Sequence, residues 1–129
     1  MLEPLHPELW RRRLKAIITS IAILPEGKDP ACLRRLYHLL ALTPMPLRQW
    51  FFPRLPEDMF ERLLLQSRQT AAFSLIGESF DFAVTAGRQG EGAAITLRLD
   101  NVEVEACDSS LARAIARAIC EIGLRLSAP

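Results

Sequence analysis

Residues 95–106 read ITLRLDNVEVEA, and this stretch decides the fold. Apolar and polar side chains alternate along it, which is typical of a strand with one buried face. The alternation slips by one residue at Asp100-Asn101, and a two-residue hairpin turn there would bring both apolar sets onto one face. A β-bulge at the same place is the alternative. The hairpin predicts three cross-strand pairs: Leu99 with Val102, Arg98 with Glu103, and Leu97 with Val104.

The residues before this stretch extend the predicted sheet. Phe80, Phe82 and Val84 alternate with polar or small residues, and the glycine-rich residues 87–92 are expected to form a flexible loop between two strands. Residues Phe73–Ile76 are predicted as a further strand at the start of the sheet. We therefore expect an antiparallel meander of three to four strands, because consecutive strands joined by short turns pair with each other.

Helical spacing of apolar residues dominates the first half of the chain. Three helices are predicted to begin near Pro7, at Asp29-Pro30 and at Pro56, since proline fits the first turn of a helix. A last helix over 111–126 has a continuous apolar face and hydroxyl or carboxylate residues before it that can cap its first turn.

These elements predict a fold of the α+β class. We expect one domain, 1–129, with three N-terminal helices in residues 1–70 and the sheet in residues 71–129. The C-terminal helix should pack on the sheet, because both have an apolar face to bury.

Charge and cysteine content set the broad class of the protein. The chain carries 16 Lys/Arg and 15 Asp/Glu, but residues 1–70 hold 11 basic and 7 acidic side chains, whereas residues 71–129 hold 5 and 8. The 3 cysteines leave one unpaired in any disulfide scheme, which favours a reducing compartment. The apolar run 16–24 is too short to span a bilayer, and no small-residue cleavage site follows it. We expect a cytoplasmic protein with no membrane partner.

The sequence contains no recognisable catalytic motif. GxSxG, HExxH and CxxC are absent, and the only histidines are His6 and His38. Cys32 and His38 are six residues apart and so lie on opposite sides of a helix, where they cannot bind the same metal ion. Glu103 and Glu105 lie on one face of a predicted strand, as carboxylates on the solvent side of a sheet commonly do. We expect no enzyme activity, no cofactor and no metal.

An aromatic segment lies between the second and third predicted helices, framed by the prolines of residues 44–56. Prolines hold such a segment in place, so its rings can contact a partner at low entropic cost. Trp and Arg are also frequent among the residues that dominate binding energy. The alternative is that the rings pack in the core. The predicted partner-binding residues are Arg48, Trp50, Phe51, Phe52 and Arg54.

Basic side chains form a second candidate surface, suited to phosphates or to an acidic partner. Their alternative role is to be solvated or salt-bridged on helix faces. The candidate contacts are Arg11, Arg12, Lys15, Arg34, Arg35, Arg113 and Arg117.

The missing catalytic motifs and the aromatic segment favour a non-enzymatic protein-binding module: an adaptor, a dedicated chaperone, or an inhibitor of a larger complex. The alternative is a nucleic-acid-binding accessory or regulatory protein that uses the basic N-terminal half. A homodimer, formed through the amphipathic helices or an open sheet edge, is compatible with both hypotheses.

Overall fold

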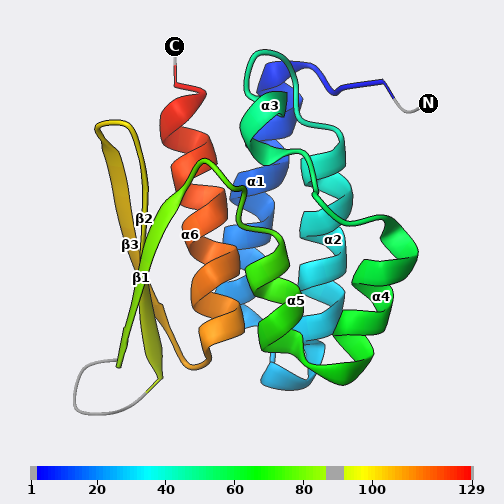
Figure 1. Cartoon of the computed structure of the whole chain (residues 1–129), viewed down its shortest axis with the longest axis vertical. Helices are drawn as coiled ribbons and strands as arrows, with labels where there is room; N and C mark the ends of the chain where they lie inside the picture. The colour runs from blue at the N-terminus through cyan, green and yellow to red at the C-terminus, as the bar shows by residue number, and fades with distance from the viewer. Residues whose placement is uncertain (1–2, 87–91, 129) are drawn as a thin grey trace.

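The computed structural model describes residues 3–86 and 92–128. Every helix of these described residues lies on the same side of a small sheet (Figure 1). This arrangement confirms the predicted α+β class and the packing of the C-terminal helix on the sheet. The elements are α1 (Pro7–Ile23), the 3-10 turn η1 (Glu26–Lys28), α2 (Asp29–Ala41), α3 (Arg48–Phe51), α4 (Glu57–Gln66), α5 (Arg68–Ser74), β1 (Asp81–Ala86), β2 (Ala93–Leu99), β3 (Val102–Asp108) and α6 (Leu111–Leu126).

The sheet is an antiparallel meander in the order β1-β2-β3. Its second turn is the predicted hairpin at Asp100-Asn101, and the bulge alternative is wrong because all three predicted pairs form in register. Asp100 has φ of 55°, the left-handed conformation that Asp tolerates better than most residues. The glycine loop predicted for residues 87–92 lies outside the described residues except for Gly92.

The predicted strand at Phe73–Ile76 is wrong, because these residues end the helix α5 and the turn after it. Ser67 caps this helix by accepting a hydrogen bond from the backbone N–H of Thr70 at 3.2 Å. Ala71 and Ala72 are fully buried on its inner side. A short apolar run fits a buried strand and a buried helix equally well by periodicity alone. Two helices, α3 and α5, are therefore present in addition to the expected ones.

Helix α6 lies between the sheet and the other helices. It packs against β2 and β3 on one side and against α1, α2 and α5 on the other. Small residues allow this close packing: a Cβ added at Gly123 would lie 3.0 Å from Leu14 and 3.2 Å from Trp10. The Trp10 ring is fully buried, and its Nε1 donates to the carbonyl of Leu39 at 3.2 Å, which ties α1 to α2.

A buried ion pair joins the first turn of α6 to the helical layer. Arg113 Nε donates to Asp29 Oδ1 at 2.7 Å, and the two side chains are only 10% and 5% exposed. The guanidinium also donates to the carbonyls of Ile21 and Leu24 at the end of α1. Burial alone would lower the pKa of Arg113, but the hydrogen bond and charge of Asp29 raise it above its ordinary value. Arg113 thus links α1, α2 and α6.

We expect Arg113→Ala to lower the free energy of unfolding by about 3 kcal/mol, because it leaves Asp29 buried without its closest cation. Arg117→Ala is the matched control on the same helix. Arg117 is 38% exposed and its ion pairs with Asp108 and Glu121 are 3.7 and 3.5 Å long, so a loss of about 1 kcal/mol or less is expected. Urea denaturation followed by circular dichroism measures both values. Equal losses would show that the buried pair has no special weight.

Candidate functional site

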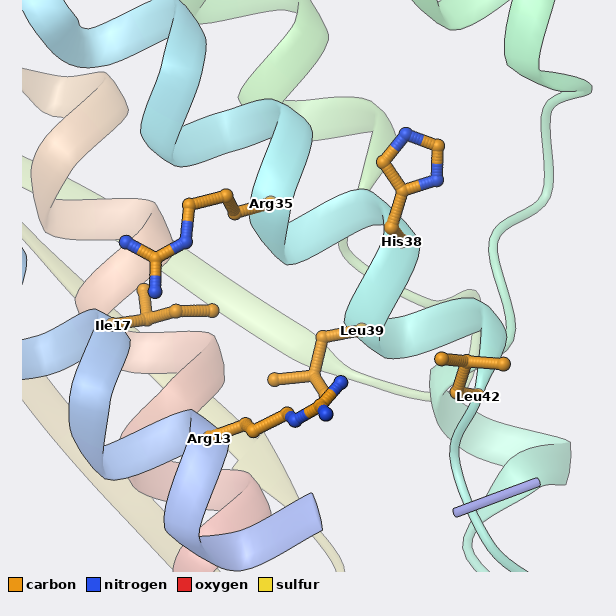
Figure 2. Close-up of a pocket in the computed structure, with 6 residues that line it drawn as sticks. All are labelled: Arg13, Ile17, Arg35, His38, Leu39 and Leu42. Atoms are coloured by element: carbon orange, nitrogen blue, oxygen red, sulfur yellow. The ribbon is translucent and has the colours of Figure 1, made fainter. Parts of the chain in front are cut away.

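The candidate site is a groove of about 360 Å³ between α1 and α2. Its floor is apolar and consists of Ile17, Leu39 and Leu42. Arg13, Arg35 and His38 form its rim. Figure 2 shows Arg35 reaching from α2 toward Ile17, while Arg13 reaches from α1 toward Leu39. We call these six residues the cationic groove.

Helical spacing explains why these side chains lie together. Arg13 and Ile17 are four residues apart, so they occupy one face of α1. The α2 side of the groove has the spacing i, i+3, i+4, i+7, which also defines one helix face. Ile17 and Leu39 are 2% and 5% exposed, because each helix buries its apolar stripe against the other. The arginines lie at the edges of these stripes, so their long stems cross the apolar floor and their charges stay in water.

The electrostatics of the cationic groove are positive. Arg35 donates to the hydroxyl of Ser20 at 3.2 Å, which is a neutral partner. The His38 imidazole lies 3.7 Å from the carboxylate of Glu57, and both side chains are exposed. Two permanent positive charges therefore face a hydrophobic floor. Such a site can accept an apolar side chain whose neighbours carry carboxylates, because the floor buries the apolar group and the rim meets the negative charge.

The structure places some residues of the predicted aromatic site in the core and others at the surface. Phe51 is 3% exposed and lies in the core, where its ring centroid is 5.7 Å from that of Trp10. Trp50 is half-buried against the same core. Phe52 is 47% exposed, and the Arg48 guanidinium lies 4.4 Å above its ring. The segment thus combines the two fates considered from the sequence, core and surface.

Arg54 completes the predicted aromatic site. It is exposed and lies 3.7 Å from the carboxylate of Glu78. Among the five predicted contacts, only Phe52 and Arg54 are classed as exposed, and Arg48 is partly buried beside Phe52.

The residues of the predicted basic surface likewise do not share one environment. Four of its arginines are engaged with other groups of the chain: Arg11 donates to the Leu124 carbonyl at 2.6 Å, Arg34 forms two hydrogen bonds to Glu61 of 2.6 and 2.9 Å, Arg113 pairs with Asp29, and Arg117 with Asp108 and Glu121. The Arg34 hydrogen bond lowers the pKa of Glu61 below its usual range. Arg12, Lys15 and Arg35 are exposed.

Of the predicted basic contacts, only Arg35 lines the cationic groove. The structure adds Arg13 and His38, which sequence reasoning did not select as contacts. The spacing on α2 was a signal for His38. Arg13 belongs to the basic run 11–15, but its place beside Arg35 depends on how the two helices pack.

Groups with chemical reactivity do not converge on the cationic groove. Cys32 and Cys120 are buried and Cys107 is exposed, and all are free thiols. Burial raises the pKa of both buried thiols above the ordinary value. Within residues 3–86 and 92–128, no cluster of three or more His, Cys, Asp or Glu has a geometry that could hold a metal ion. No helix in the same described part of the chain combines the length and apolar content needed to cross a bilayer.

The fold and the groove define a small α+β protein with a one-sided sheet and a cationic groove between its first two helices. No protein-family model matches the chain, and no curated protein or solved structure matches it. What this chain does must therefore be argued from its own residues.

In the native protein at pH 8, one thiol per chain should react rapidly with a disulfide reagent such as Ellman's reagent. Cys107 is exposed, whereas Cys32 and Cys120 are 6% and 0% exposed and their thiols are held neutral by burial. The other two should react only when the chain unfolds. Absorbance of the released thiolate measures both phases. Cys107→Ser is the control and should abolish the rapid phase without changing the slow one.

Proposed function

We propose that this chain is a non-enzymatic protein-binding module whose docking site is the cationic groove. Its ligand is an acidic, amphipathic segment of another protein, with one apolar side chain on the groove floor and carboxylates beside Arg13 and Arg35. The observation that carries the proposal is the pairing of two arginines with a floor of Ile17, Leu39 and Leu42. An adaptor, a dedicated chaperone or an inhibitor of a larger complex can use such a site. We place this role in the cytoplasm, which the free thiols favour.

The shape of the groove favours a protein segment over a nucleic acid. Phosphate recognition needs several cations that follow a backbone, and nucleic-acid interfaces are polar. Here Arg11, Arg34, Arg113 and Arg117 are engaged with other groups of the fold. The cations that do line the groove border an apolar floor, which a phosphate backbone cannot fill. Nucleic-acid binding stays the alternative, and the experiment below includes it.

A pair of synthetic helical peptides tests the proposal. The first carries leucines at i and i+4 flanked by glutamates, and the second has lysines in place of the glutamates. We expect the protein to bind the acidic peptide at least tenfold more tightly than the basic one, which corresponds to about 1.4 kcal/mol. The preference should shrink as salt is raised from 50 to 500 mM, because rim charges are screened. Fluorescence anisotropy measures both peptides and a labelled RNA duplex.

Charge reversal at the rim provides the matched comparison. The double variant Arg13→Glu/Arg35→Glu should bind the acidic peptide with at least tenfold lower affinity, whereas Arg62→Glu should leave the affinity unchanged. Arg62 is exposed on α4 and does not line the groove. Equal binding of both peptides, equal losses in the two variants, or tighter binding of the RNA duplex would each overturn the proposal.

A further inference from the structure

The strand β1 is an open edge of the sheet. It pairs with β2 on one side through the unbroken register from Asp81↔Arg98 to Ala86↔Ala93, and it is the last strand on the other side. All 6 of its residues are exposed. The edge is visible in Figure 1, where β1 borders the sheet. An edge of this kind presents a row of free N–H and C=O groups that another strand can pair with.

The inner face of β1 is apolar and is left uncovered. Phe82 and Val84 pair with Leu97 and Ile95, which are almost fully buried, so the four side chains lie on the same face of the sheet. Helix α6 packs on β2 and β3. As a result Phe82 is 52% exposed and Val84 is 42% exposed. The apolar core of the domain thus continues onto the open strand, beyond the two strands on which α6 packs.

A hollow of about 340 Å³ lies beside this face. Aromatic side chains line it, and the ring of Phe73 on α5 lies 5.6 Å from that of Phe82. When a strand is added to a sheet edge, pockets beside that edge receive its alternate side chains, and this hollow is in the position of such a pocket.

We propose that the strand added to β1 is the β1 of a second copy of this chain. Antiparallel pairing about a twofold axis at Ala83 brings Ala83 opposite its own equivalent. Phe82 then lies opposite Val84 of the other copy, and Val84 opposite Phe82. Aromatic with β-branched residues is a favourable cross-strand combination, and the small alanine fits the position where a residue meets itself. This register pairs every residue of the strand from Asp81 to Thr85.

Charge also favours the second copy. Asp81 is the only charged residue of β1, and in this register it lies opposite Thr85 of the other copy rather than opposite another carboxylate. Arg98 lies 3.8 Å from Asp81 within the same chain. Many proteins place lysines, prolines or β-bulges on an exposed edge strand to prevent it from pairing with another chain. The strand β1 contains none of these features. The sequence of this edge therefore tolerates a copy of itself.

The dimer that results has one continuous six-stranded sheet. Because the axis at Ala83 is perpendicular to the sheet, the helices of both copies lie on the same face. The two Phe82 and two Val84 side chains then form an apolar strip between the two helical layers. This interface is separate from the cationic groove, so each copy keeps its own groove. The proposed dimer does not depend on the proposed ligand.

Two substitutions to lysine on the outer face of β1 test the register. Ala83→Lys places two like charges opposite each other and should weaken the dimer at least tenfold. Thr85→Lys, on the same face of the same strand, places a lysine opposite Asp81 of the other copy and should leave the dimer intact or strengthen it. Sedimentation velocity at concentrations from 1 to 200 µM measures the dissociation constants.

A mixing experiment excludes misfolding as the cause of any loss. Ala83→Glu should also weaken the dimer, but an equimolar mixture of the Ala83→Lys and Ala83→Glu chains should form a heterodimer, because the opposite charges meet at the axis. Unfolded chains would not be rescued in this way. A monomeric wild-type chain over the whole concentration range, or a dimer that Ala83→Lys leaves unchanged, would overturn the proposal.

Cross-linking gives a second reading of the same axis. In a Cys107→Ser background, Ala83→Cys should form an intermolecular disulfide when two equivalents of copper(II) phenanthroline accept the two electrons and the buffer takes up the two thiol protons. Thr85→Cys should not, since its two copies would be about 13 Å apart along the strands and a disulfide spans Cα atoms about 4.4–6.8 Å apart. Cross-linking of both variants to the same extent would contradict the register.

Discussion

The packing of α6 between the sheet and the helical layer is the constraint on which the rest of this structure depends. Nine of its 16 residues are buried, and several of them are alanines. Small side chains let α1 and the sheet approach the helix axis closely, so one helix serves as the core of both layers. Arg113 then fixes the first turn of α6 to the ends of α1 and α2. This packing also sets the width of the cationic groove, because α1 and α2 are positioned against α6 and against each other.

The same helix explains why the sheet is unevenly covered. An α-helix is about 10 Å across and neighbouring strands are about 4.8 Å apart, so one helix covers about two strands. In this chain α6 packs on β2 and β3, and the third strand extends beyond it. The apolar side chains of β1 are therefore a product of the geometry, since a three-stranded sheet is too wide for one helix. A wider helical layer or a second sheet is the physical way to bury them.

How far the sequence could predict this structure depends on how local each feature is. The hairpin at Asp100-Asn101 was predictable to the residue, because alternation and the turn together fix the register. The run Phe73–Ile76 was not, because four residues are too few to show a period; the structure has a helix there, capped by Ser67. The cationic groove was predictable only in its α2 half. Its other half required knowledge of which face of α1 packs on α2, which is tertiary information.

The aromatic segment shows a similar limit at the level of neighbouring residues. Phe51 is in the core and Phe52 is half exposed, although they are adjacent and chemically identical. Phe51 is the last residue of α3, whereas Phe52 follows it with an extended backbone; the first ring meets Trp10 and the second meets Arg48. Composition could identify the segment as a candidate contact surface. Only the backbone conformation determines which ring lies in the core and which lies at the surface.

The contact of Arg113 with the carbonyl of Ile21 joins residues that are 92 positions apart. During synthesis α1 leaves the ribosome long before α6, and its apolar stripe, which includes Trp10 and Leu14, then has no sheet-covered helix to pack against. The nascent helical half cannot reach its final packing until translation has passed the last helix. Over that interval α2, which is made directly after α1 and packs on it, is the first element able to cover a stripe that the finished domain buries.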